Sequence, residues 1–222
     1  MLAQGVERMT KGVMQEFVRL RAISQNQANL DTPGFRQTFS GLRQGKLDKW
    51  RDDSQGSLKE TGRGLDVAPR EGTFFEVERG GETFLTTRGD LRRDLQGYLT
   101  VGSGERILDQ TGSPIKVESI ENVSIDESGN VYSRGKLQTT LRRVIVSDVK
   151  ELGGTLFSPV DNAKITEDEG EMMVGMLNTS NADLTRNQTD LVATIHRARI
   201  YTQAATLQDG TIERAIREML GT

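Results

Sequence analysis

The sequence predicts an α+β fold, with N- and C-terminal helices paired as a coiled-coil stalk and a central, mostly antiparallel β domain. Helical patterns lie at the two ends of the 222-residue chain, and short strand patterns separated by glycine-rich turns lie between them. No amphipathic helical segment interrupts these strands, which favours antiparallel pairing. We therefore expect a helical domain from residues 1–31 and 178–222, a connector at 32–68, and a β-rich outer domain at 69–177.

The first helix is predicted from apolar residues that recur every three or four positions. These residues are Leu2, Val6, Met9, Val13, Phe17, Leu20 and Ile23. The pattern stops because Pro33 cannot donate to the helix ladder and pushes Thr32 out of the α region, so the helix should end by about Asp31. Gly34 then suits the position of a type II turn that requires a positive φ.

After this turn, residues 36–50 predict an extended connector with a few spaced apolar side chains, and the charge run Lys46–Asp53 predicts solvated surface. Alternating or β-favouring runs then follow, with Gly80-Gly81 as a hairpin turn between two of them. The expected strands are Leu65–Val67, Thr73–Glu78, Thr83–Arg88, Tyr98–Val101, Arg106–Leu108, Ile115–Val117, Val123–Ile125, Asn130–Ser133 and one long run, Thr139–Asp148.

The C-terminal helix is predicted from about residue 182 to 219, which is about 55 Å at 1.5 Å per residue. Its seam alternates steps of four and three over several heptads, as in a coiled coil. The seam residues are Leu184, Gln188, Leu191, Ile195, Ala198, Thr202, Ala205, Asp209, Ile212, Ile216 and Met219. Small and polar seam residues suit close packing in a crowded assembly, and the alternative is a long helix packed on its own N-terminal partner in a monomer.

Composition excludes several functions. A net charge of −3 and a pI near 5.4 give no support for nucleic-acid binding, and the absence of cysteine excludes disulfides. His196 is the only histidine, so the sequence gives little support for a catalytic triad with histidine or for a histidine metal site. Gly102–Gly104 lacks the rest of a nucleotide-binding loop, and Glu167–Glu171 fits a solvated loop better than a cation site. We expect no enzyme activity, no cofactor, no membrane insertion and no cleaved signal peptide.

Four motifs resemble those of the bacterial flagellar rod and hook axial proteins. The first corresponds to the family signature Asn-Asn-Leu-Ala-Asn-x-x-Thr-Pro-Gly-Phe and is carried by Asn26, Asn29, Thr32, Pro33, Gly34 and Phe35. The others are Gln55–Ala68 with the strand Gly72–Val77 that follows it, Thr87–Asp90 with the glycine turns that follow it, and Met176–Leu184, which contains Ser180 and Asn181. The chain departs from the family at Gln25, Gln27, residues 69–71, Asn178 and Ala182.

The resemblance implies a structural protein that crosses the periplasm as part of the flagellar basal-body rod. It implies helical self-assembly with copies of itself and with other rod and hook axial proteins, after delivery by the flagellar type III export apparatus. The short path from Phe35 to Gln55 is most similar to the proximal rod protein, because distal rod proteins carry a long insertion there. The alternatives are a distal rod or hook-type axial protein, or a soluble coiled-coil adaptor or enzyme that carries a β domain on a helical stalk.

Overall fold

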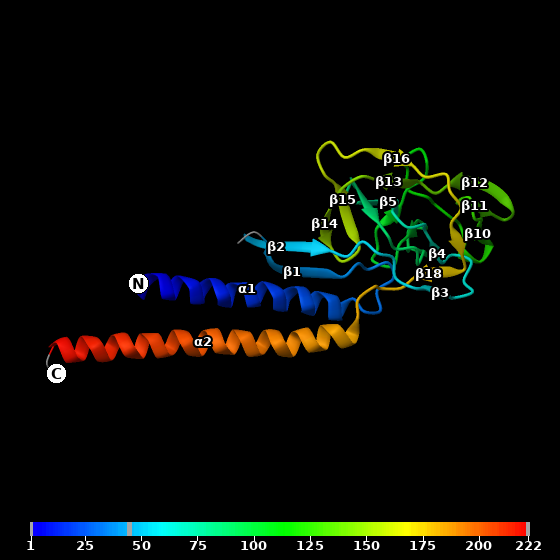
Figure 1. The fold of residues 1–222 in the computed structure, drawn as a ribbon. Coiled ribbons are helices and arrows are strands. Elements are labelled where there is room, and N and C mark those ends of the chain that lie inside the picture. Colours follow the sequence, from blue (N-terminus) through cyan, green and yellow to red (C-terminus); the bar gives the residue numbers. More distant parts are fainter. Residues whose placement is uncertain (1, 44–45, 221–222) are drawn as a thin grey trace. The chain divides into compact units, whose positions relative to one another are not determined.

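The structure is a computed structural model that describes residues 2–43 and 46–220 (Figure 1). The described chain divides into two compact units. The helical unit consists of residues 2–28, 38–43, 46–52 and 183–220, and the β unit consists of residues 29–37 and 53–182. The domain boundaries expected from the sequence, with a separate connector, stay a prediction.

The helical unit contains two long helices, α1 (Leu2–Ala28) and α2 (Leu184–Leu220), which lie side by side and contact each other (Figure 1). The start of α2 is capped by Asp183, whose Oδ1 accepts the backbone N–H of Arg186 at 3.0 Å. In the part of the chain that the structure describes, no helix is long and apolar enough to cross a membrane. The two helices and the antiparallel β region confirm the predicted α+β class, whereas coiled-coil geometry stays a prediction.

A β hairpin completes the helical unit. Strands β1 (Thr38–Arg43) and β2 (Lys46–Arg51) pair antiparallel, and β1 contacts α1. Phe39 lies opposite Trp50, and the two rings stack with their centroids 6.0 Å apart. An extended connector was expected here, and the pairing could not be predicted because the two residues between the strands are Gln-Gly and carry no Asn-Gly or Asp-Gly signal.

The β unit is built from antiparallel pairs. Among the described residues its largest sheet has nine strands, in the order β14-β15-β6-β5-β9-β8-β7, with β13 and β16 branching from β5. The elements are β3 (Leu58–Glu60), β4 (Val67–Ala68), β5 (Thr73–Arg79), β6 (Glu82–Thr86), β7 (Arg92–Arg93), β8 (Leu99–Thr100), β9 (Arg106–Ile107), the 3-10 helix η1 (Ile120–Asn122), β10 (Val123–Ile125), β11 (Asn130–Ser133), β12 (Lys136–Thr140), β13 (Arg143–Val146), β14 (Val149–Gly153), β15 (Leu156–Pro159), β16 (Ile165–Glu167), β17 (Met173–Val174) and β18 (Met176–Asn178).

Two strand expectations differ from the structure. The run Thr139–Asp148, predicted as one strand, divides between β12 and β13, which belong to different sheets. Ile115–Val117 forms one isolated bridge, between Tyr98 and Lys116, and no strand. Both differences arise from long-range pairing, which local alternation does not specify.

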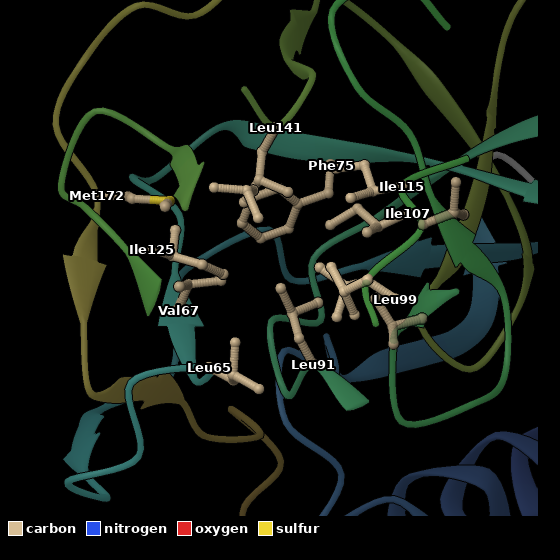
Figure 2. Close-up of a cluster of buried hydrophobic side chains, with 14 of the residues drawn as sticks. Leu65, Val67, Phe75, Leu91, Leu99, Ile107, Ile115, Ile125, Leu141 and Met172 are labelled. Carbon is tan, nitrogen blue, oxygen red and sulfur yellow. The ribbon is translucent and has the colours of Figure 1, made fainter. Parts of the chain in front are cut away.

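The β unit has two apolar cores, one on each face of β5. Phe75 and Val77 point into the larger core, whereas Phe74 points into a smaller one with Phe157, in edge contact at 5.5 Å. Figure 2 shows the side chains of the larger core converging from several strands and loops on one interior. Because both faces of β5 are covered, five successive residues from Thr73 are buried instead of alternating with exposed ones.

Three turns share the sequence Asp-x-x-Gly-x and one geometry: Asp94–Tyr98, Asp109–Ser113 and Asp126–Asn130. In each, the aspartate Oδ1 accepts the backbone N–H of the fifth residue, at 2.7, 3.0 and 2.9 Å in chain order. The glycines have φ values of 94°, 80° and 86°, a region that other residues resist. Burial opposes ionisation of the three carboxyl groups, but hydrogen bonds to the carboxylates outweigh it and hold the pKa of each below its ordinary value.

Candidate functional site

The contact between α1 and α2 is polar and closely packed near its middle. Glu16, which is only 3% exposed, accepts a hydrogen bond at 3.0 Å from Nε of Arg197. One turn earlier on α1, a Cβ atom built on Gly12 would lie 2.7 Å from Cε1 of Tyr201. Gly12 therefore makes room for an aromatic ring of α2, and the carboxylate of Glu16 joins the two helices through a charged hydrogen bond.

Asn26 links three elements of the helical unit. Its Oδ1 accepts the backbone N–H of Thr38 at 2.9 Å, and its Nδ2 donates to the carbonyl oxygen of Thr38 at 2.8 Å. Nδ2 also lies 3.3 Å from Oδ1 of Asn187 on α2. Asn26, the first residue of this chain that matches the family signature, is thus buried, and it holds the start of the hairpin against α1 at a point where α2 also meets them.

The seam residues expected on α1 lie at different depths. Ile23 is buried, Met9 and Leu20 are half-buried, and Val13 and Phe17 are exposed, Phe17 by 61%. The side chains of Leu2 and Val6 lie outside the described residues. At 100° per residue, Ile23 lies between Gly12 and Glu16 around the helix axis, whereas Val13 and Phe17 lie about 100° farther around, so the expected apolar face overlaps the observed α2 contact only in part.

The seam residues expected on α2 divide in the same way. Leu191, Ala198 and Ala205 are half-buried, whereas Leu184, Ile195 and Thr202 are exposed, Ile195 by 46%. The side chains of Ile212, Ile216 and Met219 lie outside the described residues. In the part of α2 whose side chains the structure describes, the buried residues are polar: Asn187 and Thr194, one heptad apart.

Sequence reasoning missed the polar residues of the helix contact. Hydrophobic periodicity gives no weight to glycine, glutamate or asparagine, although Gly12, Glu16 and Asn26 share one face of α1. The usable signal was the heptad spacing of Asn187, Thr194 and Tyr201, which runs beside the apolar positions.

The Pro-Gly-Phe signature lies at a junction inside the β unit, where the other family motifs meet it. The Gly34 N–H donates to the carbonyl oxygen of Asn178 at 2.8 Å, and the hydroxyl of Thr87 donates to the carbonyl oxygen of Gly34 at 2.6 Å. Gly34 has φ of 73°, and a Cβ atom there would lie 2.5 Å from the carbonyl oxygen of Thr87. Phe35 is completely buried. Only glycine fits this position without moving the backbone.

Asn181 ties together three segments of the same junction. Its backbone N–H donates to the carbonyl oxygen of Phe35 at 3.3 Å, and its Oδ1 accepts the backbone N–H of Gln37 at 2.5 Å. Its Nδ2 donates to the carbonyl oxygen of Ser54 at 2.8 Å. Nearby, Gly56 approaches the carbonyl carbon and oxygen of Thr179 so closely that a Cβ atom would overlap them. Asn181 therefore fixes the segment that follows the Pro-Gly turn against the segment that leads to α2.

The Thr87–Asp90 motif completes the junction. Arg88 donates two hydrogen bonds to the carboxylate of Asp90, at 2.7 and 2.8 Å. A Cβ atom on Gly102 would overlap Oδ2 of Asp90, and one on Gly89 would overlap the carbonyl oxygen of Val67. These glycines are required by close packing, and Gly102 lies against a carboxylate engaged by arginine.

The chain is similar to curated flagellar proteins, although no protein-family model matches it. It is 27% identical over 220 residues to the flagellar hook-basal body complex protein FlhP of Bacillus subtilis, covering 87% of this chain and 81% of the relative. It is 24% identical over 180 residues to the flagellar basal-body rod protein FlgG of the same organism, covering 73% and 68%. The flagellar basal-body rod protein FlgF of Rhizobium meliloti is 24% identical over 228 residues, covering 91% and 92%.

Proposed function

We propose that this chain, a flagellar basal-body rod-family protein, is a structural subunit of the periplasmic rod that assembles with copies of itself and with other axial proteins. The names of its relatives describe parts of the flagellar basal body. These names do not favour the alternative interpretation, a soluble coiled-coil adaptor or an enzyme. Relatives include both FlgG and FlgF, so a proximal position stays a prediction that rests on the short connector. Delivery by the flagellar type III export apparatus belongs to the same proposal.

The observation that carries the proposal is the distribution of apolar side chains on α1 and α2. The described contact between the helices uses Glu16, Asn26 and other polar groups, whereas large apolar side chains lie exposed on other sides of both helices. The exposed set is Val13, Met14, Phe17, Leu184, Val192, Ile195, Ile200 and Leu207. Full burial of one such side chain stabilises an association by about 1.5–3 kcal/mol, so packing against neighbouring subunits would be strongly favourable.

We propose that these exposed residues, together with the rest of the predicted seam, form the contacts between subunits. Hydrogen bonds between polar side chains of α1 and α2 would set the register in which the two helices pack. Apolar packing between neighbouring chains would drive assembly. The same predicted set of contact residues includes Leu2 and Val6 of α1 and Ile212, Ile216 and Met219 of α2, whose side chains lie outside the described residues. On this reading the coiled-coil seam forms between molecules as well as within one.

The junction motifs have a second role in the proposal. Gly34, Thr87 and Asn181 hold the segments that leave α1 and lead into α2 firmly within the β unit. We infer that this junction fixes, within the β unit, the two segments from which the chain continues to α1 and to α2.

The proposal is tested by a matched pair of substitutions. Ile195 on α2 and Ile145 on β13 are exposed by 46% and 45%, so Ile195→Ser and Ile145→Ser remove similar exposed side chains. We expect Ile195→Ser to reduce the amount of this chain in isolated basal bodies and Ile145→Ser to leave it unchanged. Equal incorporation of the two folded variants would contradict the role of the helix surface, and absence of the unmodified chain from basal bodies would contradict the function itself.

A further inference from the structure

Leu95 is a fully exposed apolar side chain at the tip of the turn between β7 and β8. It is 100% exposed and is the second residue of the Asp94–Tyr98 turn. In the two turns of the same geometry, this position is Gln110 or Glu127. The turn itself therefore does not require an apolar residue there, and Leu95 fills no site in its own chain.

A hollow of about 670 Å³ lies beside β6 and the turn between β14 and β15. Phe84, Leu152 and Leu156 provide apolar lining, and Leu152 is itself exposed. Gly80 and Gly153 also line the hollow, and a Cβ atom on either would meet nothing within 4 Å. The hollow is therefore open and partly apolar, which suits the entry of an aliphatic side chain.

The exposed Leu95, here called the knob, and the hollow lie on different parts of one sheet, because the knob follows β7 whereas residues of β5, β6, β14 and β15 line the hollow. Strand β7 is at one end of the order β14-β15-β6-β5-β9-β8-β7, and β14 is at the other end. A contact that joins the β7 side of one molecule to the β14 side of the next uses two different surfaces. Such a contact is heterologous, and it continues from copy to copy as a ring or a helical array.

The charges beside the knob and the hollow are complementary. Arg93, which precedes the Leu95 turn, donates to the carbonyl oxygen of Val117 at 2.9 Å. Glu82 lines the hollow, and among the described residues neither Arg93 nor Glu82 forms an ion pair. Arg79 also lines the hollow, but it lies 3.8 Å from Glu105 and its charge is partly compensated. An arginine beside the knob would thus meet a glutamate beside the hollow.

We propose that the β unit carries a second self-association surface, in which Leu95 of one copy enters the hollow lined by Phe84, Leu152 and Leu156 of the next copy. The inference rests on the proposed function, because repeated copies must lie close together in the rod. It adds a contact between β units to the contacts between helices. Arg93 and Glu82 would orient this contact and exclude the reverse arrangement.

The test uses the absence of cysteine from the chain. Leu95→Cys and Leu152→Cys would be made as separate variants, produced together in flagellated cells, and treated with a short bis-maleimide in isolated basal bodies. We expect a covalent dimer when both variants are present and none when either is present alone. Leu137→Cys is the matched control, because Leu137 is an exposed leucine of β12 that does not line the hollow.

A charge exchange provides the second readout. We expect Arg93→Glu to lower the yield of the Leu95→Cys to Leu152→Cys dimer roughly tenfold or more, and the added Glu82→Arg change to restore it. Variants that enter basal bodies without forming this dimer would overturn the inference and leave the proposed function intact. The inference would also be overturned if Leu95→Cys formed a dimer with Leu137→Cys in the same yield as with Leu152→Cys. Absence of every variant and of the unmodified chain from basal bodies would instead overturn the proposed function.

Discussion

Replacement of Gly34 by alanine tests the junction most sharply, because the chain contains a matched control. Gly34 and Gly72 have φ values of 73° and 80°, so alanine at either position adopts the same unfavourable backbone conformation. That conformation costs about 1–2 kcal/mol for a residue other than glycine. A Cβ atom at Gly72 meets nothing within 4 Å, whereas one at Gly34 lies 2.5 Å from the carbonyl oxygen of Thr87.

The steric overlap at Gly34 adds to the conformational cost. Backbone movement that relieves it would cost about 1–3 kcal/mol, and it would weaken the hydrogen bond from the Thr87 hydroxyl, a further loss of about 1 kcal/mol. Gly34→Ala should therefore lower the free energy of unfolding by about 2–4 kcal/mol more than Gly72→Ala. Urea unfolding of both variants, followed by the fluorescence and circular dichroism of the chain, measures this difference. Equal losses in the two variants would refute the structural requirement for glycine at the junction.

Three further predictions concern the helix contact and the turns. Gly12→Ala should stabilise α1 by about 1 kcal/mol in a Tyr201→Ala background and lose that gain beside the intact Tyr201 ring, as measured by thermal loss of helical circular dichroism in a double-mutant cycle. Glu16→Ala should destabilise the helix pair by about 1–2 kcal/mol, because Arg197 loses a buried acceptor; an unchanged melting temperature would contradict the role of this pair. The aspartates of the three Asp-x-x-Gly turns have lowered pKa values, so their stabilisation is present above the ordinary aspartate pKa and lost as pH falls below it; urea unfolding between pH 6 and pH 2 should show this loss, and Asp109→Asn should reduce it.

The helices could be predicted from sequence because their signals are local. Apolar residues at spacings of three and four mark α1, and Pro33 predicts an end close to the observed last residue, Ala28. The start of α2 at Leu184 follows from a capping residue, Asp183, that is visible in the sequence. These features depend on neighbours in the chain and not on distant partners.

The sheet order and the helix contact could not be predicted, because they depend on residues far apart in the sequence. The pairing of β15 with β6 joins Phe157 to Leu85, and no local pattern specifies such a partner. The helix contact depends on Glu16 and Arg197, which are polar and carry no hydrophobic signal. Leu95 was also missed, since a single apolar residue in a turn has meaning only beside the two equivalent turns of the structure.

The motifs of the junction lie between these two cases. Gly34 could be assigned a positive φ from the Pro-Gly pair alone. Its contacts with Thr87 and Asn178 could not, because three distant segments must meet before a Cβ atom at Gly34 becomes impossible. Resemblance to a family marked these residues together, and the geometry supplies the physical reason for each.

The central claim is that this chain is a structural part of the rod, and electron cryotomography of cells that lack it tests the claim most directly. The account predicts basal bodies whose rods stop short of full length, with full-length rods restored by the unmodified chain. Complete rods of normal length in the absence of the chain would contradict it.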